Sequence, residues 1–234
     1  MLKLDQKVIS ARPSPVAIDP KKAAVIVVDM QNDFGSVGGM FERAGVDIAP
    51  IVAAVAPTAS VLAAARKAGL PVIYLQMQHR PDMADMGARD SPHRQRHARM
   101  AVGEKMMAPN GKESRILIAG EWGTQIVDAL APQAGDIVVP KHRFSGFYET
   151  ELNTILRGLE AKHLIFTGCT TSICVESTIR DAMYRDYHCV LLEDCTAEPI
   201  GHGNSRSNHD ASLLTIEVLF GWISDSQKFI EAVS

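Results

Sequence analysis

The sequence lacks the features that define several large classes of protein. Its longest uninterrupted, strongly apolar run covers only residues 23–28, whereas a membrane-spanning helix needs about 20 apolar residues. The N-terminal residues contain no apolar stretch of the kind found in a secretory signal peptide. Lys and Arg number 24 against 27 Asp and Glu, so the basic excess typical of nucleic-acid binding is missing. These absences predict a cytoplasmic protein that binds neither membranes nor nucleic acid.

Cysteines and nucleotide-binding motifs are also scarce. The four cysteines, at positions 169, 174, 189 and 195, form no C-x-x-C pair and are too few for a disulfide scaffold, which favours free thiols. The glycines form neither a G-x-x-x-x-G-K-[ST] nor a G-x-G-x-x-G pattern. We therefore predict no nucleotide cofactor and no cofactor of any other kind.

Apolar runs and helical patterns do alternate along the chain. Apolar runs typical of strands buried on both faces of a parallel sheet lie at 23–29, 71–77, 136–140, 163–168 and 188–194. Helical patterns lie at 50–68, 124–130, 151–159, 173–185 and 210–220. The alternation predicts an α/β fold with a doubly wound, mostly parallel sheet and helices on both of its faces.

The length and the prolines predict how the chain is organised. The 234 residues fit a single α/β domain over 23–234, preceded by a proline-containing N-terminal arm over 1–22 that lies outside the core. Pro57 is expected to kink or divide the helix over 50–68. The segment 78–120 is too long for an ordinary connection, so we expect it to form a lid, a pocket wall or a contact between subunits.

Three chemically reactive residues follow predicted strands. Asp29 and Lys141 each come directly after an apolar run, and Cys174 begins the helix that follows Gly168. Ligands of doubly wound sheets bind at the carboxyl ends of the strands, so these residues are expected at one edge of the sheet. The helix dipole is expected to lower the pKa of the Cys174 thiol.

Taken singly, each of these residues has an ordinary structural interpretation. Asp29 could cap a loop, Lys141 could be solvated, and Cys174 could be a buried thiol like Cys169. Together, a carboxylate, an ammonium and a thiol supply a base, charge compensation and a nucleophile.

Three motifs give the chain a family resemblance. VVDMQNDF (27–34), VPKHRFSGF (139–147) and TGCTTSICVESTIRDA (167–182) resemble the motifs of the isochorismatase-like cysteine hydrolases. The similarity extends from about residue 23 to FGWIS at 220–224. It implies a Rossmann-like fold and a hydrolase that cleaves an amide C–N bond through a thioester. The presence of cysteine at position 174 argues against the isochorismatases of this family, which need none.

The resemblance also assigns roles to individual residues. It implies a catalytic triad of Asp29, Lys141 and Cys174. It further implies a cis peptide bond at Cys169–Thr170 and an oxyanion hole formed by the backbone N–H groups of Thr170 and Cys174.

The sequence points to a small-molecule substrate, with the exact compound left open. The motifs resemble those of ureidoacrylate amidohydrolases, whereas HRPDMADM (79–86) resembles a segment of the biuret and triuret hydrolases. We therefore expect a small ureide, with an N-carbamoyl amino acid, a nicotinamide-like amide, or a catalytically idle scaffold as alternatives. The substrate-binding residues that we predict are Phe34, His79, Arg143, Phe144 and Tyr148. Surface exposure and ordinary packing are the alternative interpretation of these side chains.

Histidines offer the only pattern suggestive of a metal. His93 and His97 have the spacing of metal ligands, but nearby arginines would repel a cation, and no Asp-His-His set like that of the nicotinamidases in this family can be aligned. We therefore expect these histidines and His79 to be solvated loop residues and predict no metal site. We also expect a homo-oligomer, either a dimer or a tetramer.

Overall fold

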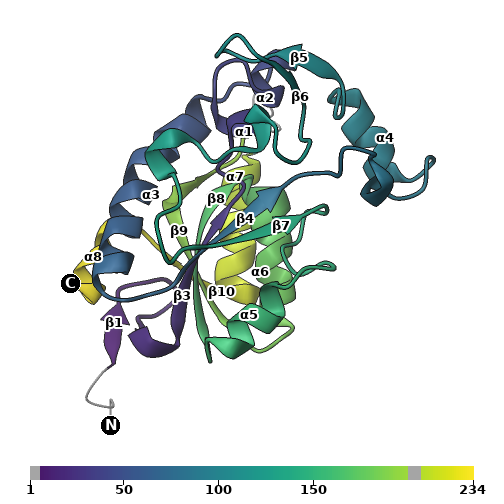
Figure 1. Cartoon of the computed structure of the whole chain (residues 1–234). Helices are drawn as coiled ribbons and strands as arrows, with labels where there is room; N and C mark the ends of the chain where they lie inside the picture. The colour runs from purple at the N-terminus through teal and green to yellow at the C-terminus, as the bar shows by residue number, and fades with distance from the viewer. Residues whose placement is uncertain (1–5, 200–206) are drawn as a thin grey trace.

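The computed structural model describes residues 6–199 and 207–234, and within them the main sheet has six parallel strands (Figure 1). The spatial order of the strands is β10-β9-β8-β3-β4-β7. Their bounds are β3 Ala23–Val28, β4 Val72–Met77, β7 Ile137–Lys141, β8 His163–Cys169, β9 His188–Ala197 and β10 Gly221–Ser224. The five predicted strands are confirmed. The sixth, β10, was missed because four residues are too short a run to give a strand pattern.

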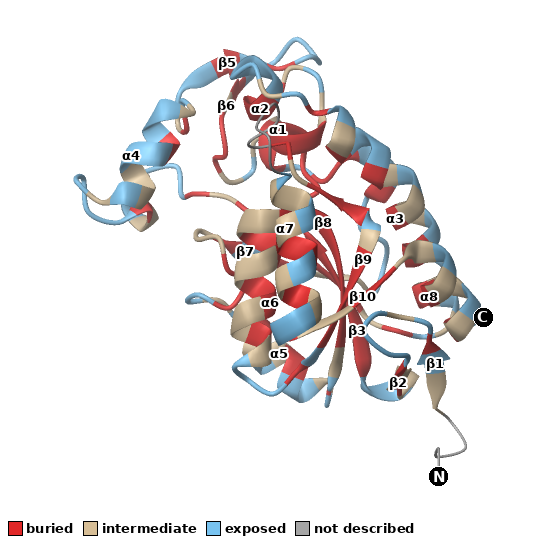
Figure 2. Ribbon diagram, turned by 180° about the vertical axis from the view of Figure 1, so that it is seen from behind, coloured by how far each residue is buried: buried red, intermediate tan, exposed pale blue. Residues whose placement is uncertain are grey.

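Helices cover both faces of this sheet, which confirms the doubly wound α/β prediction (Figure 2). Their bounds are α1 Asn32–Gly35, α2 Met40–Arg43, α3 Ala49–Lys67, α4 Pro92–Arg99, α5 Leu152–Gly158, α6 Glu176–Met183, α7 Asn208–Thr215 and α8 Ser226–Val233. Alternate residues of β3 point to opposite faces. Val25 and Val27 pack in the core on the α3 and α8 side, and Ile26 and Val28 pack on the α5, α6 and α7 side.

Helix α3 continues across Pro57, so the expectation that this proline divides the helix is wrong. By length and apolar composition, α3 alone among the described helices could cross a membrane. In this fold, Ile51, Val61 and Leu62 form a buried stripe that packs against the sheet. That stripe accounts for part of the helix's apolar character.

Local packing changes two other predicted helices. The pattern at 124–130 forms two short 3₁₀ turns, because Ile126 between them pairs as an extended residue with Gln31. The helical pattern at 173–185 begins with a π-helical turn, Thr171–Val175, before α6. Both departures lie beside the carboxyl ends of the central strands.

The predicted N-terminal arm contributes to the core. Strands β1 (Lys7–Ile9) and β2 (Val16–Ile18) pair in antiparallel fashion. Ile9 and Ile18 are fully buried within the core cluster on the α3 side, so the expectation that this segment lies outside the core is wrong.

The segment 78–120 lies beyond the carboxyl ends of the strands and carries α4 and a small hairpin (Figure 1). The hairpin consists of β5 (Lys105–Met107) and β6 (Glu113–Arg115). The buried carboxylate of Asp33 accepts hydrogen bonds from the backbone N–H of Leu117 at 2.7 Å and from that of Met40 at 3.1 Å. The polar end of the first motif therefore anchors the far end of this segment.

We predict that Gly168→Ala disrupts the fold near the strand ends. Gly168 has φ +111°, and a Cβ there would lie 2.0 Å from the carbonyl oxygen of Val28. Gly69, with φ +75° and open space around it, is the matched control. Urea unfolding should show a loss of about 1–2 kcal/mol for Gly69→Ala, from the left-handed backbone alone. Gly168→Ala should lose at least about 3 kcal/mol, because the clash adds to that strain. Equal losses would refute the close approach of β8 to β3.

Candidate active site

Asp29, Lys141 and Cys174 meet at the carboxyl ends of the central strands. The Nζ atom of Lys141 lies 2.8 Å from Oδ2 of Asp29, and both side chains are almost fully buried. The Cys174 thiol lies close enough to both side chains for each of them to shift its pKa. The structure thus brings together the three residues that the sequence singled out.

The backbone of β3 and β4 fixes the position of Asp29. This residue adopts the left-handed conformation with φ 51°, which aspartate tolerates better than most residues. Its N–H donates to the carbonyl of Leu75 at 3.0 Å, and its Oδ1 accepts from the N–H of Met77 at 3.1 Å. The carboxylate is therefore held where the chain leaves the sheet.

Lys141 is the last residue of β7 and pairs in register with Met77 of β4. Its ammonium also donates to the carbonyl of Arg143 at 3.1 Å and contacts the sulfur of Met77 at 3.6 Å. These contacts hold the buried cation beside Asp29.

Cys174 lies in the π-helical turn after β8. The peptide bond Cys169–Thr170 is cis, which confirms the expectation from the family resemblance. Cys169 itself points its thiol at the carbonyl oxygen of Asp29, 3.2 Å away. The backbone of Thr170 and the thiol of Cys174 therefore lie in the same short segment beside Asp29.

Burial dominates the protonation of this site. It raises the pKa of the Cys174 thiol, and the negative charge of Asp29 adds to this while Lys141 opposes it. The expectation of a pKa lowered by the helix dipole is therefore wrong. Burial also raises the pKa of Asp29, against the opposing charge of Lys141. For Lys141, burial favours the neutral amine, but Asp29 and Cys174 outweigh it and raise the pKa.

A cavity of about 340 Å³ opens onto the triad. Its lining consists of Asp29, Phe34, Met40, Phe41, Met77, Arg96, His97, Arg99, Met100, Phe144, Cys169, Thr170, Ile173 and Cys174. Most of these side chains are apolar, and Phe34 packs edge-to-face on Phe41 with ring centroids 5.0 Å apart. Apart from the triad, Arg96 and Arg99 are the positively charged side chains of this lining, and both are exposed residues of α4.

The structure divides the predicted substrate-binding residues into two groups. Phe34 and Phe144 line the cavity, whereas Arg143, Tyr148 and His79 are not among the described residues that line it. Arg143 donates to the carbonyl oxygens of Asp85 and His142 and lies over the ring of the half-exposed Tyr148. His79 is fully buried. The prediction of a pocket lined by these three residues is therefore wrong.

The sequence patterns did not point to the cavity residues from α2, α4 and the position after α4. Met40, Met100, Arg96 and Arg99 reach the site only because the segments that carry them fold over the strand ends. An apolar helical pattern in 96–100 was absent, so no signal in the sequence pointed to them. The polar residues of the first motif also have structural roles, since Gln31 hydrogen-bonds both to the N–H and to the carbonyl of Met77.

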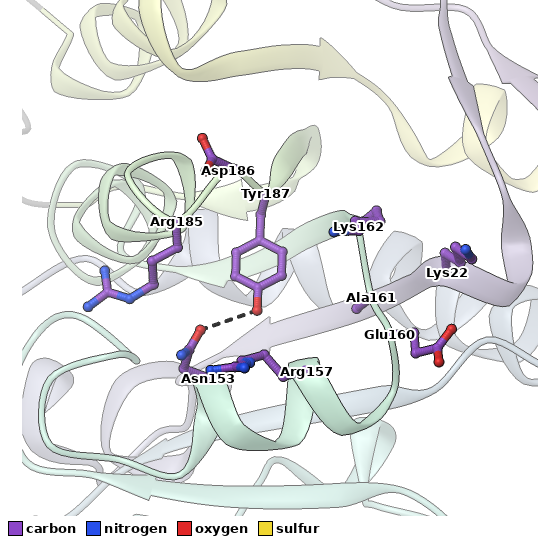
Figure 3. A pocket seen from close by; sticks show the side chains of 9 residues that line it. All are labelled: Lys22, Asn153, Arg157, Glu160, Ala161, Lys162, Arg185, Asp186 and Tyr187. Atoms are coloured by element: carbon purple, nitrogen blue, oxygen red, sulfur yellow. Dashed lines mark hydrogen bonds between the residues drawn. The ribbon is translucent and has the colours of Figure 1, made fainter.

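A second cavity, of about 530 Å³, lies at the opposite end of the sheet (Figure 3). Lys22, Lys162 and Tyr187 line it, and each of them directly precedes a strand: β3, β8 and β9 respectively. The Tyr187 hydroxyl hydrogen-bonds to Asn153. Ligands of doubly wound sheets bind at the carboxyl ends. The cavity beside the triad is therefore the candidate active site.

Comparisons with known proteins agree with this geometry. Residues 23–228 match the isochorismatase domain. A cysteine hydrolase from Pseudomonas syringae pv. phaseolicola is 32% identical, with a TM-score of 0.77 over 92% of this chain and 94% of that one. N-carbamoylsarcosine amidase from Thermoplasma acidophilum is 28% identical, with a TM-score of 0.64 over 88% and 96%. The chain therefore belongs to the isochorismatase-like cysteine hydrolase family.

We predict that Lys141→Ala destabilises the protein by about 3–5 kcal/mol at pH 8, because it leaves the carboxyl group of Asp29 buried without its cation. The loss should shrink towards pH 5. Without Lys141 the Asp29 pKa rises further, so the folded variant binds a proton that the unfolded chain releases, and stability falls as pH rises. Urea unfolding at both pH values measures this. Lys105→Ala, which breaks an exposed pair with Glu113, is the control and should cost under about 1 kcal/mol.

Proposed function

We propose that this protein is a cysteine amidohydrolase that cleaves the C–N bond of a small carbamoyl or ureido compound and releases ammonia or an amine. The proximity of the Cys174 thiol to the buried Asp29–Lys141 pair, at the wall of a cavity, carries this proposal. A thiol, a base and a fixed positive charge are the groups that a nucleophilic attack on an amide requires.

The first half of the reaction forms an acyl-enzyme. Since burial raises the pKa values of both the thiol and the carboxyl group, the resting cysteine is protonated and Asp29 is a stronger base than a solvated aspartate. Asp29 takes the thiol proton as the sulfur of Cys174 attacks the carbonyl carbon. The ammonium of Lys141 stabilises the developing thiolate charge.

The backbone N–H groups of Thr170 and Cys174 are proposed to stabilise the oxyanion, an effect worth about 3–4 kcal/mol per donor in comparable sites. Asp29 then passes its proton to the departing nitrogen, and the C–N bond breaks to leave a thioester on Cys174. In the second half, Asp29 accepts a proton from water as the water attacks the thioester. The C–S bond then breaks as Asp29 returns its proton to the sulfur, which restores the thiol, and the product acid leaves.

We predict that Cys174→Ser folds normally and loses nearly all turnover, because a serine hydroxyl stays protonated where the site is built for sulfur. Ammonia release measures the activity, and mass spectrometry of the wild-type protein with an amide-like electrophile should find one adduct on Cys174. Cys189→Ala, a buried thiol of β9 away from the cavity, is the control. Retained activity in Cys174→Ser, with loss in Cys169→Ser, would contradict the assignment. An unmodified Cys174 would favour the idle scaffold instead.

The cavity lining favours one kind of carbamoyl substrate over the others. Its mainly apolar wall suits a substrate with an apolar body, and Arg96 and Arg99 at the same wall suit a carboxylate at the far end. Ureidoacrylate and N-carbamoyl amino acids have this combination, whereas biuret and triuret carry no carboxylate. The similarity to N-carbamoylsarcosine amidase supports the same choice.

We predict that kcat/KM is highest for a carbamoyl compound that carries a carboxylate, in an ammonia-release screen that also includes biuret, triuret and nicotinamide. The double substitution Arg96→Ala/Arg99→Ala should raise KM for that substrate at least tenfold, equivalent to about 1.4 kcal/mol, and leave its kcat nearly unchanged. Arg94→Ala on the same helix is the control, since Arg94 donates to the carbonyl of Gly87 outside the cavity. Faster turnover of nicotinamide than of every carbamoyl compound would overturn the proposed substrate class.

A further inference from the structure

Three histidines form a cluster beside the candidate active site. Each of His79, His93 and His97 offers one ring nitrogen, and the three nitrogens lie within 4.8 Å of one another. His93 and His97 are one turn apart on α4, and His79 follows β4. His79 is fully buried and His97 is 8% exposed, so the expectation that these are solvated loop residues is wrong.

The hydrogen bonds of the cluster leave ring nitrogens with free lone pairs. Nδ1 of His79 lies 3.2 Å from Oδ1 of Asp85, and Nδ1 of His97 lies 2.8 Å from the carbonyl oxygen of His93. Both Nδ1 atoms face acceptors and therefore carry the proton, which leaves Nε2 unprotonated in each ring. A histidine whose other nitrogen donates to a carboxylate or a carbonyl is the usual arrangement around a bound metal.

Two of these nitrogens are buried without a partner. Among the described residues, Nε2 of His79 and Nε2 of His93 are enclosed and make no hydrogen bond. A buried polar atom without a partner costs about 1–3 kcal/mol.

We propose that His79, His93 and His97 bind one divalent transition-metal ion, with zinc as the best fit to three imidazole nitrogens. Zinc–nitrogen bonds are about 2.0–2.1 Å long. Because the three ring nitrogens lie within 4.8 Å of one another, small side-chain rotations would let all three bind the same ion. Three protein ligands leave a coordination position open for water or a ligand oxygen. Since His97 also lines the substrate cavity, the ion lies in the wall of that cavity.

The surrounding charges are compatible with a cation. Of the arginines of α4, Arg96 and Arg99 are exposed to solvent, which screens their charge, and the guanidinium of Arg94 donates to the carbonyl of Gly87. Arg143 acts on the cluster as an opposing charge, and its guanidinium donates to backbone carbonyls. Lys141 also acts on His97, and its ammonium is paired with Asp29. The carboxylate of Asp85, against His79, offsets the charge of Arg143.

Zinc titration of the full-length protein, freed of metal by chelator dialysis, tests this site. The titration uses the Cys174→Ser variant, so that the catalytic thiol cannot bind the ion. Calorimetry should find one zinc per chain with a micromolar or lower Kd. Adding His93→Ala should weaken binding at least tenfold, while adding His188→Ala, an exposed histidine outside the cluster, should leave it unchanged. Co²⁺ in place of zinc should give visible absorption without a thiolate charge-transfer band.

The outcomes separate the alternatives, and none depends on enzyme activity. Absence of binding, unchanged affinity in the His93→Ala variant, or a thiolate band would overturn the proposal. If His93→Ala does not fold, thermal unfolding of the Cys174→Ser protein decides. Zinc at 100 times the Kd should raise the unfolding free energy by about 2.7 kcal/mol, and an unchanged Tm would refute the site.

Discussion

The buried pair of Asp29 and Lys141 constrains the geometry of the whole active edge. Placing two charges out of water costs several kcal/mol per ion unless they are paired and hydrogen-bonded. Here the partners come from neighbouring strands, since the N–H of Met77 at the end of β4 donates to Asp29 and the carbonyl of Arg143 after β7 accepts from Lys141. The pair is therefore stable only while the ends of β3, β4 and β7 keep their mutual register.

The first motif serves this constraint through more than its aspartate. Gln31 hydrogen-bonds to both backbone groups of Met77, and Asp33 accepts from Leu117 and Met40. Gly123 lies against the Asp33 carboxylate, where a Cβ would be 2.1 Å from Oδ2. One short sequence thus supplies the proposed base and also holds the chain segments that enclose it.

Local patterns in the sequence predicted the fold and the meeting of three reactive side chains, because apolar runs and strand-end positions are encoded by neighbouring residues. The residues of the cavity wall were harder to predict, because Met40 and Arg99 reach the cavity only through the tertiary folding of segments that show no clear sequence pattern. The pKa of the Cys174 thiol is raised, although its place at the start of a helix predicted a lowered value, because burial of the side chain is the largest influence on it. His79 and His97 were misjudged for the same reason, as exposure is a property of the folded chain.

The catalytic residues and part of the cavity lining come from different segments of the chain. The reactive groups lie at or just after the ends of strands, whereas Arg96, His97, Arg99 and Met100 of the cavity lining belong to the segment 78–120. A hydrogen bond between Asp33 and Leu117 anchors that segment near its C-terminal end. The hydrogen bonds that hold Asp29 and Lys141 come from the strand ends, so substitutions at 96–100 change the cavity lining and leave those bonds in place. New specificities can therefore evolve, or be engineered by exchanging this segment between relatives, while the chemical step is inherited intact.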